Sequence, residues 1–317
     1  TQGYSSAASD VYKRQIEDLY YPQSPYLFNI IEPNLLGKIY EIFLTEQLVL
    51  LENNTIGLGK KKDCQNRSVV TTPTEIVKYM VDKTLSKVCE GKTPSEILNI
   101  SVADIACGSG IFLEEAFAYL QDYCVQWYIC NGQTDHLIET GIDLYKLPLQ
   151  EKKDILCSCI YGIDIDIHAV EVAKFSLLIK LIEDETAPSV SEVVPILPDL
   201  GDNIQFGNSL VSQTELNGIS GANRQMMEIA PFDWSTINNG CGFDVIIGNP
   251  PYVNTEGMHA LLPSAEVEVY KKKYKTSHKQ FDKYFIFIEQ AINKINENGL
   301  VCYICLLYTS PSPRDLS

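Results

Sequence analysis

The sequence predicts an α/β fold built on a doubly wound, mostly parallel sheet. Short apolar runs typical of buried strands alternate with longer segments whose apolar residues recur at helical spacing. Polar or glycine-containing segments follow directly after three of these runs, and ligands of such sheets bind beyond the carboxyl ends of the strands. The sequence shows no internal repeat, which argues against a repeat array.

The composition is that of a folded protein and limits its partners. Of the 317 residues, 45% are hydrophobic and 21% are charged, which argues against a disordered chain. The net charge of −16 and the pI near 4.7 argue against a protein that coats nucleic acid, although locally clustered basic residues could still contact it. No apolar run approaches the roughly 18 residues of a membrane helix, so we expect a cytoplasmic protein without a membrane partner.

The ten cysteines do not have the spacing of a disulfide framework or a metal site. Cys157 with Cys159, and Cys302 with Cys305, fall in apolar strand-like runs without a histidine at ligand spacing. We interpret them as buried thiols in a reducing compartment and expect no bound metal.

The N-terminal part is predicted to be mostly helical. Apolar residues between 34 and 50 share one face at helical spacing, which predicts an amphipathic helix, and the polar stretch 53–66 is predicted to be a loop. Thr72-Pro73-Thr74-Glu75 has the pattern of a capping box with proline in the first turn, so a helix is expected from there to about Val88.

Strands and helices alternate through the rest of the chain. Strands are predicted over 97–106, 159–165, 203–206, 243–247 and 300–304, and helices over 111–120, 169–182 and 281–295. Residues 121–154 are interpreted as an inserted helical excursion, and Asn298-Gly299 is expected to close the last helix.

The first candidate site is the loop Asp104-Ile105-Ala106-Cys107-Gly108-Ser109-Gly110, between a predicted strand and its helix. Glycines let the backbone approach a ligand, and the helix N-terminus offers unpaired amides. Leu113 stands where a dinucleotide fingerprint needs its third glycine, and the acid Asp104 suits an amine-bearing ligand better than a pyrophosphate. The alternative is a tight turn with a purely structural role.

A second candidate is Asp164, which ends the next predicted strand. A carboxylate at this position can accept hydrogen bonds from both hydroxyls of a ribose. Its separation from the glycine loop exceeds the roughly 20 residues of a minimal unit, and the insertion accounts for the excess. The alternative is a solvated strand end.

The third candidate is Asn249-Pro250-Pro251-Tyr252, which follows the buried run 243–248. Two prolines fix the backbone, so the amide of Asn249 and the carbonyl of Pro250 are predicted to be neighbouring acceptors beside the Tyr252 ring. Such a set fits a planar group that bears an NH₂. Accepting both N–H bonds would pull the nitrogen toward tetrahedral geometry and free its lone pair for attack. An ordinary Pro-Pro turn is the alternative.

Five short motifs occur in the order found in gamma-class adenine-specific DNA methyltransferases. They are Thr72-Pro73, the loop 104–110, Asp164, Gly207-Asn208-Ser209-Leu210 and Asn249-Pro250-Pro251-Tyr252. Residues 34–305 resemble the methyltransferase region of type I modification subunits and of fused type II restriction-modification enzymes. Leu36-Gly37-Lys38-Ile39-Tyr40-Glu41 resembles the helix that precedes their first cofactor motif. The resemblance implies an S-adenosylmethionine-dependent methyltransferase fold with a helical N-terminal extension, and S-adenosyl-L-methionine as cofactor.

The resemblance also implies a role for each matched residue. Thr72 and the glycine loop would hold the amino-acid end of the cofactor, Asp164 its ribose and Asn208 its adenine edge. Asn208 stands where many relatives have an aspartate. The implied cofactor-binding residues are Thr72, Pro73, Asp104, Ala106, Cys107, Gly108, Gly110, Phe112, Asp164, Ile165 and Asn208. The implied catalytic residues, which would take an adenine flipped out of double-stranded DNA, are Asn249, Pro250, Pro251 and Tyr252.

A dense basic stretch follows the Asn249 turn and is the weaker candidate for contact with the DNA backbone. It contains Lys271, Lys272, Lys273, Lys275 and Lys279, together with His278 and Lys283. A solvated charged face is the alternative.

The resemblance divides the chain into four parts. Residues 1–15 are interpreted as an artefactual or disordered leader and 306–317 as an artefactual tail, because both resemble translated read-through sequence, with natural flexible termini as the alternative. Residues 16–66 form a helical N-terminal segment, and 67–305 form an incomplete catalytic domain. In the family this domain continues into further sheet and a target-recognition domain. We expect the protein to act with such a recognition domain or with a separate specificity subunit.

The expected function is site-specific methylation of the exocyclic amine of adenine in a restriction-modification system. Two alternatives stay open. One is a glutamine methyltransferase acting on translation release factors, which shares the Asn-Pro-Pro-Tyr motif, and the other is a non-catalytic DNA-binding subunit. An oxidoreductase is disfavoured because of Leu113.

Overall fold

A five-stranded parallel sheet forms the centre of the computed structural model, which describes residues 46–50, 56–60, 72–185 and 195–305. Its strands are β3 (Val102–Asp104), β6 (Ile160–Asp164), β7 (Ile204–Phe206), β8 (Phe243–Gly248) and β9 (Ile295–Tyr303). Their order is β7-β6-β3-β8-β9, and every pairing is parallel. In this order the sheet grows outward from β3 in both directions, which confirms the predicted doubly wound fold.

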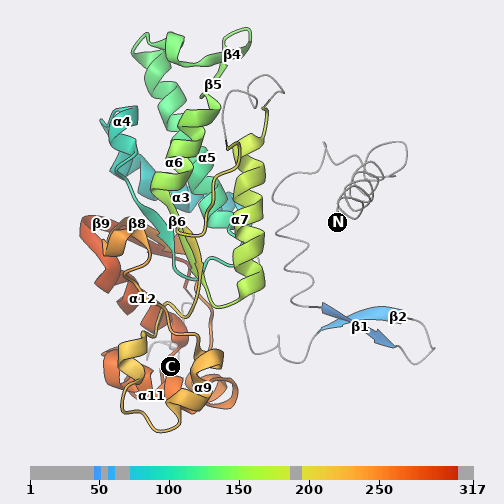
Figure 1. The fold of residues 1–317 in the computed structure, drawn as a ribbon, viewed down its shortest axis with the longest axis vertical. Helices are drawn as coiled ribbons and strands as arrows, with labels where there is room; N and C mark the ends of the chain where they lie inside the picture. Colours follow the sequence, from blue (N-terminus) through green and yellow to red (C-terminus); the bar gives the residue numbers. More distant parts are fainter. Residues whose placement is uncertain (1–45, 51–55, 61–71, 186–194, 306–317) are drawn as a thin grey trace, which may run out of the picture.

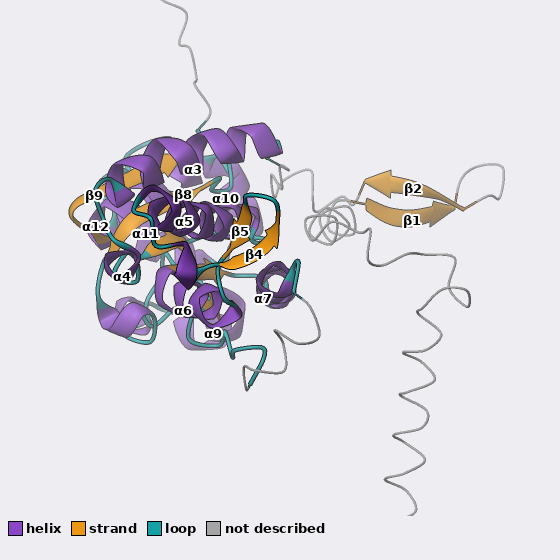
Figure 2. Cartoon of the chain, turned by 90° about the horizontal axis from the view of Figure 1, so that it is seen from above, coloured by secondary structure: helices purple, strands orange, loops and turns teal. Residues whose placement is uncertain are grey.

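Helices cover both faces of this sheet (Figures 1 and 2). One face packs against α3 (Thr74–Cys89), α5 (Ile111–Cys130), α6 (Leu149–Cys159) and α7 (Ile167–Ile182), and the other against α9 (Ala222–Ile229), α10 (Thr255–Leu261), α11 (Ser264–Lys273) and α12 (Lys283–Lys294). Successive strand residues face opposite sides, since Val102 joins the first apolar cluster and Ala103 the second. Burial on both faces makes the central strands β6 and β8 predominantly apolar, and this is why their sequence pattern predicts them.

The first strand is shorter than predicted because a helix occupies its expected start. Residues 94–97 form α4 (Pro94–Ile97), and β3 begins at Val102. The hydroxyl of Thr93 accepts the Glu96 N–H at 3.3 Å, and the Glu96 carboxylate accepts the Thr93 N–H at 2.9 Å. The capping box formed by Thr93 and Glu96 is the sequence pattern that indicates this helix.

The last helix also ends earlier than predicted. α12 ends at Lys294, and Ile295 already pairs with Phe243 of β8. Asn298 and Gly299 therefore lie within β9 and do not close the helix, although Asn298 has a left-handed φ of 66°. The predicted helical termination is wrong because pairing with the neighbouring strand replaces it.

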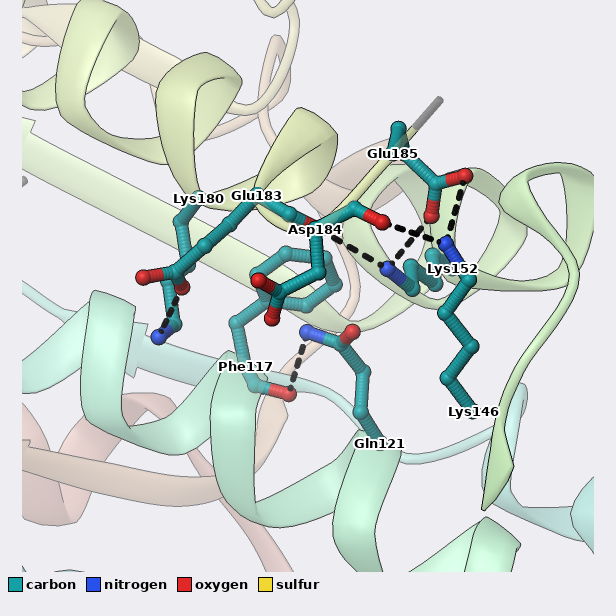
Figure 3. A network of polar contacts seen from close by, with 8 residues as sticks. All are labelled: Phe117, Gln121, Lys146, Lys152, Lys180, Glu183, Asp184 and Glu185. Carbon is teal, nitrogen blue, oxygen red and sulfur yellow. Dashed lines mark hydrogen bonds and ion pairs between the residues drawn. The ribbon is translucent and has the colours of Figure 1, made fainter. Parts of the chain in front are cut away.

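The insertion between the first two sheet strands is only partly helical. It contains a 3₁₀ turn (Thr134–His136) and an antiparallel hairpin of β4 (Ile138–Gly141) and β5 (Leu144–Lys146), followed by α6. Ammonium groups of Lys146 and Lys152 lie 3.0 and 2.7 Å from the carboxylate of Glu185 (Figure 3). The Glu185 side chain is almost fully buried, so the two lysines compensate its charge and anchor the insertion to the end of α7.

The N-terminal prediction requires correction. Residues 46–50 form strand β1 (Glu46–Leu50), which pairs antiparallel with β2 (Ile56–Lys60). The helix predicted over 34–50 is thus wrong at 46–50, and the loop predicted over 53–66 is wrong at 56–60. Two short apolar runs separated by polar residues are the pattern of a hairpin, whose ladder pairs the backbone groups. The rest of the helical segment 16–66, the motif at 36–41 and both predicted foreign ends lie outside the described residues.

Within the described ranges no helix combines the length and apolar character needed to cross a bilayer. The cysteine prediction is correct in part. Cys159 is buried and Cys157 and Cys302 are half-buried, whereas Cys305 is exposed because it lies beyond the end of β9. The described part of the chain contains no cluster of three His, Cys, Asp or Glu side chains suited to a metal ion.

Candidate active site

The predicted motifs meet at one edge of the sheet. The glycine loop follows β3, Asp164 ends β6, Asn208 follows β7 and Asn249 follows β8. Because these strands are parallel and adjacent, their carboxyl ends lie side by side. Segments far apart in the sequence therefore form one site.

The glycine loop depends on the conformational freedom of its glycines. Gly108 and Gly110 have φ values of 53° and 92°, in the left-handed region. A Cβ on Gly110 would lie 3.0 Å from the Cβ of Ala173 in α7. The loop therefore approaches α7 closely at the point where α5 begins.

Asp164 holds this loop in place. One carboxylate oxygen accepts the Gly108 N–H at 2.8 Å, and the other accepts the Asp166 N–H at 2.8 Å. The Cys107 N–H donates to the carbonyl of Ile163, which adds a third link between loop and strand. Burial raises the pKa of Asp164, and the two backbone hydrogen bonds oppose that rise. Each oxygen has a second lone pair, so the carboxylate can also accept from a diol.

Asp104 lies between the glycine loop and the end of β8. It is 2% exposed, and its Oδ1 accepts the Ala106 N–H at 3.0 Å. A Cβ on Gly248 would lie 2.6 Å from this oxygen, so only glycine allows the close approach of β8. Burial raises the pKa of Asp104 to about 8, and the charge of Asp164 adds to the rise. A cationic ligand group at this carboxyl would favour its ionised form.

The side-chain amide of Asn249 is held by two hydroxyls. Its Nδ2 donates to Thr72 Oγ1 at 3.1 Å, and its Oδ1 accepts from the Tyr252 hydroxyl at 2.6 Å. The Tyr252 hydroxyl also lies 2.9 Å from the carbonyl oxygen of Ile304, a second acceptor for its single proton. Burial raises the pKa of Tyr252 to about 12, so the phenol remains a donor at neutral pH.

The predicted capping box at Thr72 is wrong in its details. Helix α3 does form, but its N-cap is Pro73 and no side chain makes a capping hydrogen bond there. The Thr72 hydroxyl instead accepts a hydrogen bond from the side-chain amide of Asn249. Thr72 therefore joins the start of α3 to the turn after β8.

Residues of α12 that the sequence reasoning missed support the Asn249 turn. Asp282 Oδ1 accepts the Val253 N–H at 3.0 Å, and the Lys283 N–H donates to the Val253 carbonyl at 2.8 Å. The ring of Tyr284 meets that of Tyr252 edge to face, with 5.9 Å between centroids. The available signal was an aspartate at the start of an aromatic helix pattern, which is typical of an N-cap.

Asn208 lies at the sheet edge as predicted, but both ends of its amide have partners within the protein. Its Nδ2 donates to Glu266 Oε1 at 2.9 Å, and its Oδ1 accepts the Leu210 N–H at 3.1 Å. Glu266 also accepts from the Tyr270 hydroxyl and lies 3.7 Å from the Lys283 ammonium. The contact of Asn208 with a cofactor stays a prediction.

The lysine stretch does not form a uniform patch. Lys271, Lys272, Lys275 and Lys279 are exposed, and Lys272 pairs with Glu268 at 2.6 Å. Lys273 instead pairs with Glu215 at 2.9 Å and donates to the Leu210 carbonyl. Four of the five predicted lysines are thus exposed at the surface. Lys273 is half-buried, and its contacts hold the end of α11 against the rest of the protein.

The sheet order and the motifs at its carboxyl edge define an S-adenosylmethionine-dependent methyltransferase fold. Residues 158–308 match the family model of the Eco57I restriction-modification methylases. The chain is 45% identical over 289 residues to the type II restriction enzyme and methyltransferase RM.Eco57I of Escherichia coli, covering 91% of this chain and 28% of that protein. These findings confirm the predicted resemblance to restriction-modification methyltransferases.

More distant relatives and solved structures also match. The type II methyltransferase M.BstVI of Geobacillus stearothermophilus is 24% identical over 209 residues, which cover 65% of this chain and 28% of that protein. The DrdV–DNA complex has a TM-score of 0.45 at 17% identity, covering 74% of this chain and 20% of that one. The type I M.EcoKI protein has a TM-score of 0.38 at 17% identity, covering 74% of this chain and 34% of that one. The chain spans less than a third of the length of RM.Eco57I and less than a third of the length of M.BstVI.

Proposed function

We propose that this chain is the catalytic region of a site-specific DNA methyltransferase of a restriction-modification system. It transfers a methyl group from S-adenosyl-L-methionine to the exocyclic amine of an adenine flipped out of double-stranded DNA. The observation that carries the proposal is the Asn249-Pro250-Pro251-Tyr252 turn, held beside the glycine loop and Asp104 at one sheet edge. Its partners are double-stranded DNA and a recognition domain or specificity subunit.

The residues at the sheet edge fit such a cofactor. Asp104 is a buried carboxyl that a cationic amine would compensate, and Asp164 can accept from a ribose diol. The buried carboxyl of Asp104 and the half-buried carboxyl of Asp164 do not suit a pyrophosphate, which supports this cofactor over a dinucleotide. When bound, the cofactor supplies an electrophilic methyl group on a cationic sulfur.

The chemistry follows from the acceptors in the turn. Asn249 Oδ1 and the Pro250 carbonyl would accept the two N–H bonds of the target amine, while the Tyr252 ring stacks on the base. The lone pair of the amine would then attack the methyl carbon. The N–C bond would form as the methyl–sulfur bond breaks, the sulfur would leave as a neutral thioether, and one proton would pass from the nitrogen to water. No covalent enzyme intermediate is needed, so the residues act by positioning and by hydrogen bonding.

Single-turnover transfer of labelled methyl groups to duplex DNA tests this function, using the protein with whatever flanking sequence its gene encodes. Asn249→Ala should lower the transfer rate by at least a hundredfold and leave cofactor affinity within about twofold, because the amide acts in the transition state. Asn99→Ala, an exposed change at the opposite edge of the sheet, should retain the rate.

Three outcomes would contradict the proposal. An Asn249→Ala enzyme as fast as the wild type would exclude the chemistry assigned to the turn. Label found in glutamine of a release factor and not in DNA would support the protein methyltransferase alternative. A wild-type protein that binds DNA and shows neither cofactor binding nor transfer would support the non-catalytic alternative.

A further inference from the structure

The amide of Asn249 is held by a residue that the sequence places far from it. Thr72 lies 177 positions earlier, and its Oγ1 accepts a hydrogen bond from Asn249 Nδ2 at 3.1 Å. The Thr72 side chain is nearly buried, with 6% of the residue exposed. At the other end of the amide, Oδ1 accepts from Tyr252 at 2.6 Å. Two hydroxyls from separate elements thus bracket one side-chain amide.

The hydroxyl of Thr72 is not used to start the helix that follows it. Helix α3 has Pro73 as its N-cap and no side-chain capping bond. The N–H groups of Ile76 and Val77 donate to the Pro73 carbonyl, which provides the first helical bonds. The side chain of Thr72 therefore has a role toward the β8 turn that its helical position does not explain.

The orientation of this amide matters because its two ends are chemically opposite. Nδ2 carries two donors and Oδ1 is an acceptor, so a half-turn about the last side-chain bond would present a donor where an acceptor is needed. An N–H facing the N–H bonds of an amine would repel it. A partner that accepts from Nδ2 keeps the oxygen on the other side.

We propose that Thr72 is a positioning residue: by accepting one N–H of the Asn249 amide it keeps Oδ1 as the atom that meets the target amine. The proposal deepens the proposed function and rests on it. When the amine binds, the Tyr252 hydroxyl can exchange Oδ1 for the Ile304 carbonyl, which lies 2.9 Å away. Thr72 retains its bond to Nδ2 throughout, so the amide does not turn.

Thr72→Val tests the proposal because valine keeps the branched shape and removes the acceptor. Because Thr72 is also an expected contact of the cofactor, the rates are compared at saturating cofactor and duplex DNA, where a loss of affinity has no effect. The single-turnover rate should then fall at least tenfold, while the melting temperature is retained. Thr72→Ser keeps the hydroxyl and should stay within threefold of the wild-type rate. Thr74→Val, a matched change at the first residue of α3, should also retain the rate.

A double variant separates positioning from a general effect. If Thr72 acts only through Asn249, Thr72→Val should change the rate of an Asn249→Ala enzyme by less than twofold. If the two substitutions instead lower the transfer rate by factors that multiply in the double variant, the proposal is overturned. The proposal is also overturned by a Thr72→Val enzyme that has the wild-type rate, or by one that binds cofactor weakly but transfers normally at saturation, since that result assigns Thr72 to the cofactor alone.

Nuclear magnetic resonance of selectively labelled asparagine provides a readout independent of activity. Thr72→Val should shift the side-chain NH₂ signals of Asn249 and speed their hydrogen exchange, and Thr72→Ser should not. Unchanged signals in Thr72→Val would overturn the proposal whatever the activity. If the wild type transfers no methyl group to DNA, the proposed function fails, and these signals still decide whether Thr72 holds the amide.

Discussion

Nδ2 of Asn208 donates a hydrogen bond to Oε1 of Glu266 at 2.9 Å, and both side chains are almost completely buried. The same carboxylate accepts from the Tyr270 hydroxyl and lies 3.7 Å from the ammonium of Lys283. Burial raises the pKa of Tyr270 well above 10, and the charge of Glu266 adds to the rise, so the phenol stays protonated and donates. One buried carboxylate thus joins the loop after β7 to α11 and α12.

Glu266→Ala should destabilise the protein strongly. It removes the acceptor of two buried donors, Asn208 and Tyr270, and leaves the Lys283 ammonium without its carboxylate, so we expect a loss of about 3–5 kcal/mol in the free energy of unfolding. Urea denaturation followed by circular dichroism measures this loss. Glu268→Ala on the same helix breaks only an exposed pair with Lys272 and should cost about 1 kcal/mol or less. Equal losses in the two variants would show that the buried network contributes little.

Asp104→Asn should change how stability depends on pH. The pKa of Asp104 rises from 3.8 to about 8 on folding, so between these values the folded state keeps a proton that the unfolded state releases. This carboxyl therefore lowers stability progressively as the pH rises from about 4 to 8. Asparagine does not titrate, so the melting temperature of Asp104→Asn relative to the wild type should increase through this window. Exposed Asp135→Asn serves as the control, and a constant difference for Asp104→Asn would contradict the assignment.

Gly110→Ala should be more destabilising than Gly91→Ala. Both glycines have left-handed φ values, 92° and 73°, so each alanine carries a backbone cost of about 1–2 kcal/mol. The new Cβ at position 110 would also lie 3.0 Å from Ala173, whereas position 91 has no atom within 4 Å. We expect the contact to add about 1–3 kcal/mol, measured by urea denaturation. Equal costs would mean that α7 moves away without penalty.

Asp164→Ala should weaken cofactor binding. Loss of charge-assisted hydrogen bonds to a ribose diol is expected to reduce affinity by about 1.5–3 kcal/mol, measured by titration calorimetry with S-adenosyl-L-methionine. The variant also removes the acceptor of the Gly108 N–H, so the loop should lose order as well. Asp166→Ala, which removes the cap at the His168 N–H, should reduce stability but keep the affinity within about twofold. An unchanged affinity in Asp164→Ala would exclude this carboxylate from the site.

The sequence by itself determined the central architecture and the order of the motifs. Strands buried on both faces are predominantly apolar, so β8 and β6 stand out in the sequence, and parallel connection places the residues that follow them at one edge. The glycine loop, Asp164 and the Asn249 turn could therefore be located before the structure was known. Local pattern was less decisive at 46–50, where a pairing with 56–60 replaces the predicted helix.

Only the tertiary structure decided which side chains are partners. Thr72 has the sequence context of a helix cap, yet its hydroxyl bonds to Asn249, and Asn208 bonds to Glu266, which lies 58 residues away. A hydroxyl or an amide forms a hydrogen bond with whichever complementary group the packing brings within about 3 Å. The neighbouring residues in the sequence do not encode that choice. Helical and strand periodicity report on burial, whereas hydrogen-bond partners across the sheet edge depend on how separate elements pack together.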